Sequence, residues 1–344
     1  MFNDIRRKIR QGDRINKEEA LKLFQLEDIH SIGELANEVS NKIVSNGVFF
    51  IINIHINLTN ICINRCKFCA FSRSKSDTDA YEMSIDNVIT QIKEAKKQMG
   101  YISEVHIVSG LHPDWQFEYY LEVISTIRKM FSTIGIKAFT AVEIDFFSRK
   151  SKLTVEQILT KLKEAGLNIM PGGGAEIFNS NVRNRICPEK ISAERWLEII
   201  KTAHKCGIKT NSTMLYGHLE SYEDRVDHLL KLRELQDETK GFLAFIPLSY
   251  QPKNNEIKAS FPSGIDDLKT IAISRLVLDN IPHIKAYWIM LGEKLAQLAL
   301  LFGANCLEGT VINEKIAHSA GARSKKGITI EELVYLIKET GKLP

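Results

Sequence analysis

Residues 48–73 join a β-rich run, Val48-Phe-Phe-Ile-Ile-Asn-Ile-His-Ile-Asn-Leu58, to a loop with three cysteines, Asn60-Ile-Cys-Ile-Asn-Arg-Cys-Lys-Phe-Cys-Ala-Phe-Ser-Arg73. β-Branched and aromatic residues dominate the run, so it predicts a buried strand. The thiols of Cys62, Cys66 and Cys69 follow one another with the spacing C-x3-C-x2-C. The sequence therefore places three metal-binding side chains on one short loop at the end of a strand.

Three thiolates at this spacing can bind three irons of a [4Fe–4S] cluster and leave the fourth iron open to a small molecule. A structural zinc site usually has four ligands in two pairs, and no second C-x2-C or H-x3-H pair follows in the sequence. His55 could serve as a fourth zinc ligand, but its place inside the apolar run favours a strand residue. A disulfide is disfavoured because the other cysteines are scattered: Cys187, Cys206 and Cys306. We expect an iron–sulfur cluster at this loop.

Composition excludes several classes of protein. The chain has 344 residues, of which 44% are hydrophobic and 26% charged, and its net charge is +4. These values are typical of a globular protein without a nucleic-acid-binding surface, and the basic group Arg6-Arg7-Lys8 reads as a solvated helix face. The first residues lack the apolar core of a signal peptide, and no run of 18 apolar residues occurs. Free thiols beside an oxygen-sensitive cluster favour the cytoplasm, with no membrane or nucleic-acid partner.

Strand and helix patterns alternate along most of the chain. Residues 1–46 predict a helical extension, with helices at 17–24 and 31–45. The predicted strands cover residues 48–58, 104–108, 136–144, 167–170, 208–216, 242–248, 284–290 and 304–307. The predicted helices between and after them cover residues 84–99, 117–131, 154–165, 193–206, 223–237, 265–278, 293–302 and 330–340. Apolar strands that alternate with helices predict a parallel sheet, and this number of units predicts a (β/α)8 TIM-type barrel over residues 47–344.

In such a barrel the chemistry lies at the carboxyl ends of the strands, and the segments after the predicted strands are polar or glycine-rich. The run Gly172-Gly173-Gly174 lets the backbone approach a ligand closely, although a plain tight turn is the alternative. Glu143, expected at the end of strand 136–144, and Glu176 could bind a cationic group, with a salt bridge at the barrel rim as the alternative. His218 could donate a proton, bind a carboxylate or only support other groups.

Arginines near the predicted strand ends could bind substrate carboxylates. Arg73 follows the cysteine loop, and Arg183 and Arg185 follow the glycine run. A surface position is the default interpretation of each. We expect the phase of the segment to turn Arg183 outward.

The cysteine loop, with Phe68 just before the last cysteine, resembles the signature of the radical S-adenosylmethionine (SAM) enzymes. The resemblance implies that Cys62, Cys66 and Cys69 bind a [4Fe–4S] cluster and that Phe68 lies near the adenine of SAM. It also implies that SAM binds the open iron. One electron, from a donor such as flavodoxin or ferredoxin, then cleaves SAM to methionine and a 5′-deoxyadenosyl radical.

Further phrases resemble one branch of this family, the aminofutalosine synthases of menaquinone biosynthesis. They are residues 104–114, 137–143, 171–178, 185–188, 210–218 and 233–237. The resemblance implies a transferase that consumes SAM as a co-substrate and adds the adenosyl radical to 3-[(1-carboxyvinyl)oxy]benzoate. The products would be aminofutalosine, methionine and carbon dioxide. Two sister families share much of this sequence: the cyclase that acts later in the same pathway and the tyrosine-using synthase of the deazaflavin cofactor.

The resemblance also implies roles for residues at the strand ends. SAM contacts are expected from Ser109, Gly110, Gly172, Gly173 and Thr213. The family motif Gly-Gly-Glu reads Ser109-Gly110-Leu111 here, so Glu143 or Glu176 would bind the SAM ammonium instead. The expected substrate has two carboxylates, for which Arg73, Arg185 and His218 are the candidate side chains.

Overall fold

The computed structural model describes residues 2–344, which form eight strands and fifteen helices. The strands are β1 (Asn53–Ile56), β2 (Glu104–Ile107), β3 (Gly135–Ala138), β4 (Ile169–Met170), β5 (Lys209–Tyr216), β6 (Phe242–Ser249), β7 (His283–Ala286) and β8 (Cys306–Leu307). They form one sheet in sequence order, and every pair of neighbours is parallel. The parallel α/β barrel expected from the sequence is confirmed.

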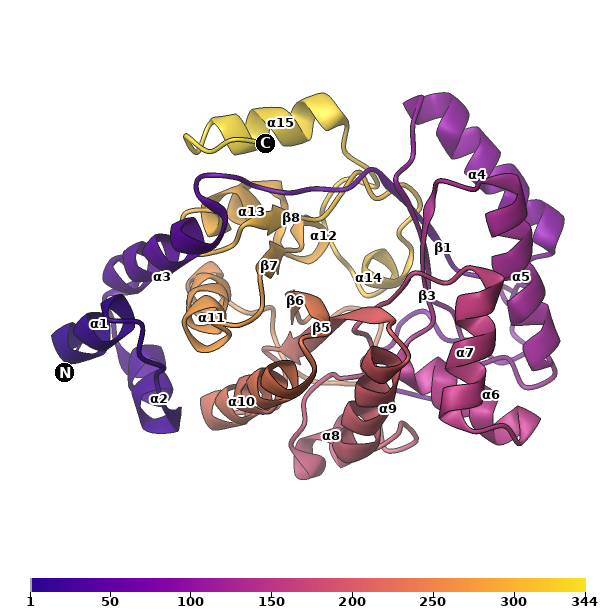
Figure 1. The fold of residues 1–344 in the computed structure, drawn as a ribbon. Coiled ribbons are helices and arrows are strands. Elements are labelled where there is room, and N and C mark those ends of the chain that lie inside the picture. Colours follow the sequence, from indigo (N-terminus) through magenta and orange to yellow (C-terminus); the bar gives the residue numbers. More distant parts are fainter. Residues whose placement is uncertain (1) are drawn as a thin grey trace.

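Helices surround the sheet (Figure 1). They are α1 (Phe2–Arg10), α2 (Lys17–Gln25), α3 (Ile29–Val44), α4 (Ile85–Met99), α5 (Phe117–Met130), α6 (Ala141–Ser151), α7 (Val155–Ala165), α8 (Ser180–Ile186), α9 (Ala193–Lys205), α10 (Tyr222–Thr239), α11 (Gly264–Val277), α12 (Trp288–Leu291), α13 (Glu293–Ala299), α14 (Ile316–Ser319) and α15 (Ile330–Lys338). Most of the long helices begin at a side chain that accepts a backbone N–H, as Ser84, Thr154 and Ser221 do. Such caps satisfy donors that the first helical turn leaves unpaired.

The two edges of the sheet are joined by hydrogen bonds. The N–H of Phe49, just before β1, donates to the carbonyl of Asn305 (3.0 Å), and the N–H of Leu307 in β8 donates to the carbonyl of Phe49 (2.9 Å). The N–H of His55 donates to the carbonyl of Ile312 (2.9 Å). The barrel therefore closes through isolated bridges between residues near β1 and residues at and beyond β8.

Helices α2 and α3 pack on the outside of the barrel, beside α10 and α11, and α1 lies further out (Figure 1). Arg14 pairs with Asp237 and Asp279, and Lys17 pairs with Asp227. The C-terminal segment returns to the same side, where Lys342 Nζ donates to Asn37 Oδ1 at 2.8 Å. The helical extension and the barrel thus share an interface.

Two strand assignments from the sequence are wrong at their ends. Strand 136–144 ends at Ala138, because Phe139 takes a positive φ of 62° and Thr140 begins helix α6. Glu143 therefore lies in the first turn of a helix. Likewise, the predicted strand 284–290 divides into β7 and the short helix α12. Helices α1, α6, α8, α12 and α14 were not predicted.

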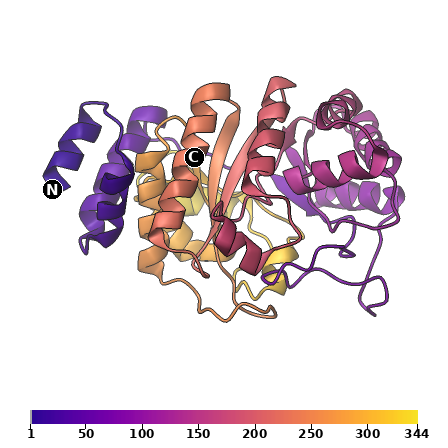
Figure 2. The same cartoon turned by 90° about the horizontal axis from the view of Figure 1, so that it is seen from below.

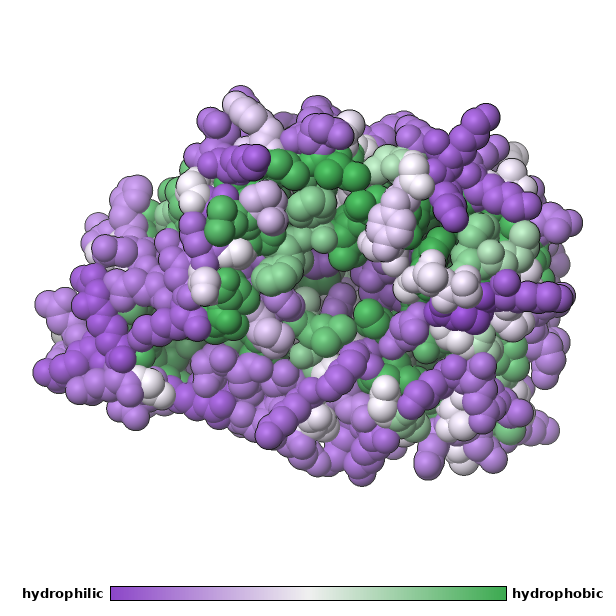
Figure 3. Space-filling view, turned by 45° about the horizontal axis from the view of Figure 1, so that its top comes forward, coloured by the Kyte–Doolittle hydropathy of each residue, from purple (hydrophilic) through white to green (hydrophobic). Residues whose placement is uncertain are grey.

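The loops that follow the strands gather at one end of the barrel. Figure 2 shows the loop after β1, in purple, and the loop after β6, in orange, extending from the same side of the molecule. Figure 3 shows hydrophilic side chains over most of the visible surface, with hydrophobic ones gathered near the middle of that face. Within residues 2–344 no helix is both long and apolar enough to cross a membrane.

Candidate active site

The cysteine loop is held by backbone hydrogen bonds to its own end and to the loop after β2. The N–H of Cys62 donates to the carbonyl of Arg73 (3.1 Å), and the N–H of Ile63 donates to the carbonyl of Leu111 (3.0 Å). Gly110 allows this approach, because a Cβ there would lie 2.2 Å from the carbonyl oxygen of Ile61. The segment expected to bind SAM therefore also fixes the cysteine loop.

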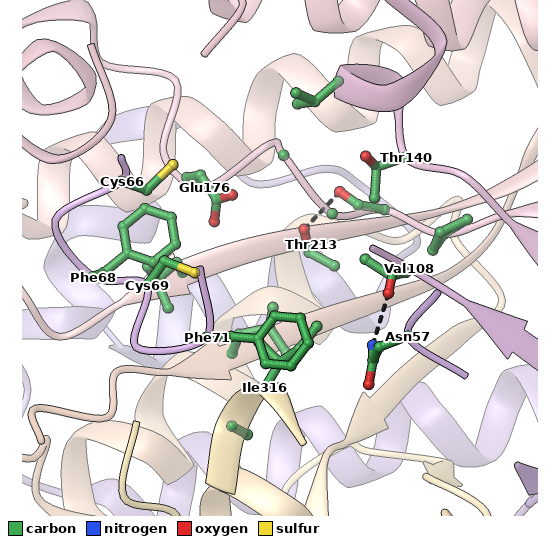
Figure 4. Close-up of a pocket in the computed structure, with 18 of the residues that line it drawn as sticks. Asn57, Cys66, Phe68, Cys69, Phe71, Val108, Thr140, Glu176, Thr213 and Ile316 are labelled. Carbon is green, nitrogen blue, oxygen red and sulfur yellow. Dashed lines mark hydrogen bonds between the residues drawn. The ribbon is translucent and has the colours of Figure 1, made fainter. Parts of the chain in front are cut away.

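A cavity of about 300 Å³ lies at this end of the barrel. It is lined by eleven of the candidate residues: Cys62, Phe68, Cys66, Cys69, Ser109, Gly110, Glu143, Gly172, Gly173, Glu176 and Thr213. Figure 4 shows Cys66, Phe68 and Cys69 together at one side of the cavity with Glu176 beside them. Apolar side chains, among them Val108, Leu215, Ile246, Leu248 and Met290, make up much of the remaining wall.

The three thiols fit an iron–sulfur cluster. Burial raises the pKa of the Cys62 thiol. Burial also raises the pKa of the Cys66 thiol, to about 12, and the nearby charges have smaller effects of both signs. Such thiols become thiolates when they bind cationic iron. Among the residues that the structure describes, no three His, Cys, Asp or Glu side chains converge on one metal ion. Ligands of a cluster each bind a different iron and lie further apart, so the donor set suits a cluster better than zinc.

Lys190 is the buried cation beside the cysteines, and the sequence did not identify it. Its Nζ lies 2.6 Å from Glu176 Oε1 and 5.0 Å from the ring centroid of Phe68. Burial opposes the charge of Lys190, but the thiols of Cys66 and Cys187 and the carboxylate of Glu176 raise its pKa. Burial alone would raise the pKa of Glu176, yet Lys190 lowers it below its usual value. Both groups are therefore charged inside the cavity.

Glu143 lies in a capping box at the start of α6. Its Oε2 accepts hydrogen bonds from the N–H (2.7 Å) and the hydroxyl (2.9 Å) of Thr140, and its Oε1 accepts the N–H of Ser109 (3.2 Å). Burial raises its pKa to about 7, although these hydrogen bonds favour the carboxylate. Both oxygens are already bound, so Glu143 connects α6 to the loop after β2.

The glycine run follows β4 and contacts β5. A Cβ on Gly172 would lie 2.6 Å from the carbonyl carbon of Ser212, and the carbonyl of Gly172 accepts the hydroxyl of Thr213 at 2.7 Å. Gly174 has a positive φ of 87°. Position 172 requires glycine because the backbone of β5 packs against it, and position 174 favours glycine because its backbone is left-handed.

The residues expected to bind substrate carboxylates do not line the cavity. Arg73 pairs with Asp79, and Arg185 is exposed. His218 Nε2 donates to the carbonyl of Leu215 (3.0 Å), while its Nδ1 accepts the N–H of Leu219 (2.7 Å). Both ring nitrogens of His218 are thus occupied.

Arg183, expected to face outward, is buried instead. Its guanidinium donates to the backbone carbonyls of Gly174, Ala175, Ile177 and Ile191. It holds the segment after the glycine run in place, and the expectation that Arg183 faces outward was wrong.

The sequence analysis also did not identify a cluster of polar side chains at the inner end of the cavity, which consists of His55, His106, Lys137 and Glu308. A usable signal existed: polar residues recur at every second position of two apolar strands, as Asn53 and His55 and as Glu104 and His106. Period two places such residues on one face of a strand.

Comparison with known families agrees with this geometry. The Radical SAM superfamily matches residues 56–232, and the CofH/MqnC C-terminal region matches residues 239–344. The chain belongs to the radical SAM superfamily and is a radical SAM transferase that uses a [4Fe–4S] cluster and SAM.

Its relatives carry two different names. An aminodeoxyfutalosine synthase of Thermus thermophilus is 44% identical over 99% of this chain and 92% of the relative. A 5-amino-6-(D-ribitylamino)uracil–L-tyrosine 4-hydroxyphenyl transferase of Methanococcoides burtonii is 40% identical over 99% of this chain and 96% of the relative. Methylornithine synthase shares the fold, with a TM-score of 0.79 at 16% identity over 99% of this chain and 97% of that one.

Proposed function

We propose that this enzyme forms aminofutalosine from SAM and 3-[(1-carboxyvinyl)oxy]benzoate, hereafter the enolpyruvyl benzoate, in menaquinone biosynthesis. The observation that carries the proposal is the 44% identity, over 99% of the chain, to a relative named aminodeoxyfutalosine synthase. The mainly apolar cavity with cysteines at one side supports it, because a flat aryl substrate needs such walls.

In this proposal Cys62, Cys66 and Cys69 bind the cluster, which together with SAM supplies the adenosyl radical. Lys190 Nζ donates to Oε1 of Glu176, so Oε2 of that carboxylate would bind the SAM ammonium. Glu143 is less suited to that role because three donors already bind it. Lys190, whose charge acts on Cys62 and Cys66, would in turn bind the SAM carboxylate.

The remaining chain keeps the reacting groups in place and excludes water. Apolar residues on β2, β5 and β6 would enclose the aryl ring, and the glycine run would allow SAM to lie against the backbone after β4. A flavodoxin or ferredoxin would supply the electron. Free cysteines and an oxygen-sensitive cluster support a cytoplasmic location.

A second candidate function is transfer of a hydroxyphenyl group from tyrosine. The 40% identity to a relative with that name, over 99% of the chain, supports it. A third candidate function is that of the cyclase of the futalosine pathway. Only the synthase adds the adenosyl group to its substrate.

The test is mass spectrometry of the products made from adenosine-labelled SAM and the enolpyruvyl benzoate, with a chemical reductant and no oxygen. We expect the label in aminofutalosine, with methionine in equal amount and little free 5′-deoxyadenosine. Parallel reactions contain tyrosine and 5-amino-6-(D-ribitylamino)uracil in place of the enolpyruvyl benzoate. Free 5′-deoxyadenosine in proportion to turnover, or a product only with tyrosine, would contradict the proposal.

A further inference from the structure

The inner end of the cavity is formed by strand residues and not by loops. His55 in β1 pairs in register with His106 in β2, which pairs with Lys137 in β3. Residues in register on parallel strands face the same side, so these three side chains form one layer inside the barrel. We call them the cavity floor. Barrel interiors usually contain branched apolar residues, so a layer of two imidazoles and an ammonium is unusual.

Most polar groups around the floor are paired with one another. Lys137 Nζ lies 2.5 Å from Glu104 Oε1, and Lys285 Nζ lies 2.8 Å from Glu308 Oε2. These two ion pairs neutralise their charges inside the barrel. Within residues 2–344, Glu104 Oε1 has the ion pair with Lys137 but no hydrogen bond, and Nε2 of His106 is buried with neither an ion pair nor a hydrogen-bond partner. A buried polar atom without a partner is costly unless a ligand binds it.

Hydrogen bonds below the floor determine which nitrogen of His106 carries the proton. Asn53 Oδ1 accepts the N–H of Val311 (3.0 Å), so its Nδ2 faces Glu308 Oε1 (3.1 Å) and His55 Nε2 (3.5 Å). An amide nitrogen only donates, and His55 Nε2 is therefore an acceptor. His106 Nδ1, 3.3 Å from the same atom, then carries the ring proton. Nε2 of neutral His106, a residue that lines the cavity, then carries a lone pair that no described group binds.

Lys137 completes the floor from the neighbouring strand. Its ammonium has three donors, and the ion pair with Glu104 does not use all of them. Both Lys137 and His106 line the same cavity as the cysteines, and much of the remaining wall is apolar. The cavity therefore combines the cysteine loop, an apolar wall and a polar floor.

We propose that His106 and Lys137 bind the aryl carboxylate of the substrate at the cavity floor. The identity of the ligand rests on the function proposed above. Lys137 donates to one carboxylate oxygen, and His106 takes up a proton from solvent at Nε2 and donates it to the other. His106 is thus a specificity-determining residue that takes up a proton from solvent when the ligand binds.

The sign of the coupling follows from the groups that face His106. Burial first, and then the charges of Lys137 on β3, His55 on β1 and Lys285 on β7, hold its pKa well below the usual value. An added carboxylate opposes these effects and raises that pKa. Binding at pH 7.5 should therefore take up about one proton, and affinity should fall as the pH rises. A phenol, which brings its own proton to Nε2, would bind without uptake.

The test is calorimetry on the cluster-loaded, unreduced protein with SAM, in two buffers of different ionisation enthalpy. The probes are the enolpyruvyl benzoate and its analogue with an aryl amide in place of the aryl carboxylate. We expect uptake of about one proton with the benzoate, none with the amide, and about 30-fold weaker binding of the amide. Equal affinity of the wild-type protein for the two probes, or binding of the benzoate without proton uptake, would overturn the proposal.

Variants add a second measurement. His106→Leu should weaken binding of the benzoate about 30-fold, abolish the preference over the amide, and leave the iron content and SAM binding unchanged. His283→Leu is the matched control, because His283 also lies on a barrel strand and also has an unpartnered ring nitrogen, yet it does not line the cavity. Retention of the benzoate preference and proton uptake in His106→Leu would refute the role of His106.

These outcomes separate this proposal from the proposed function. Carboxylate-dependent proton uptake without formation of aminofutalosine would leave the cavity floor intact and refute the function. If His106→Leu forms aminofutalosine with the wild-type KM, the proposed function stands and the role of the cavity floor is refuted. If tyrosine binds in a His106-dependent way without proton uptake, both proposals fail.

Discussion

Lys190 is the single residue on which the charge balance near the cysteines depends. Its side chain is 15% exposed, and its ammonium lies 2.6 Å from the more deeply buried carboxylate of Glu176. Loss of one partner of such a pair leaves the other charge uncompensated, which costs about 3 kcal/mol or more. We expect Lys190→Met to lower the free energy of unfolding by about 3 kcal/mol and to weaken SAM binding about tenfold, measured by urea unfolding and equilibrium dialysis.

Lys150→Met is the matched control for this variant. Lys150 also lies over an aromatic ring, 5.7 Å from the centroid of Phe146, but it is on the surface and does not line the cavity. The control should change stability by less than about 0.5 kcal/mol. Similar losses of SAM binding in both variants would show that Lys190 has no special role.

Single residues could be predicted from the sequence where chemistry fixes their spacing. Cys62, Cys66, Cys69 and Phe68 lie on one loop, so their common position followed from local sequence. Lys190 and His106 reach the cavity from distant parts of the chain, and only the folded barrel brings them together. Neither Arg73 nor Arg185 lines the cavity, because Arg73 pairs with Asp79 and Arg185 is exposed.

At the scale of elements, the glycine run after β4 depends on its contact with β5. A Cβ on Gly172 would lie 2.6–2.8 Å from backbone atoms of Ser212 and Thr213, which cannot rotate away. We expect Gly172→Ala to lower the free energy of unfolding by about 2 kcal/mol and to weaken SAM binding, because both strand ends must shift. Urea unfolding and SAM dialysis measure the two effects.

Gly264→Ala is the control, because its Cβ would meet Leu295 at an ordinary 3.5 Å in the first turn of α11. That variant should be neutral or slightly more stable. If Gly172→Ala also retains full stability and SAM affinity, the run is a plain turn.

Elements were predicted best where the helices are long and their caps are clear. Strand 136–144 was drawn too long because Ala141, Val142 and Ile144 are apolar, although Thr140-x-x-Glu143 is a capping box visible in the sequence. Apolar residues of a buried helix and of a buried strand look alike over short stretches, and the positive φ of Phe139 that separates them leaves no sequence signal.

At the scale of the whole molecule, the alternating pattern predicted the barrel, since eight strands pair in sequence order. Its closure through residues outside the regular strands could not be predicted. The substrate is the least predictable part. Relatives with different names are 44% and 40% identical to this chain. We propose that a few side chains on the cavity floor distinguish the substrates, because most of the sequence specifies the barrel and the cofactor site that these relatives share.

The most direct test of the account concerns the cysteine loop at the cavity. Anaerobically reconstituted protein should contain about four irons and four sulfides per chain, and its reduced EPR signal should change when SAM is added. Cys66→Ala should lose the cluster and the signal, whereas Cys306→Ala, which removes a buried thiol outside the cavity, should retain both. A colourless wild-type protein that binds zinc, or a SAM-independent EPR signal, would contradict the account.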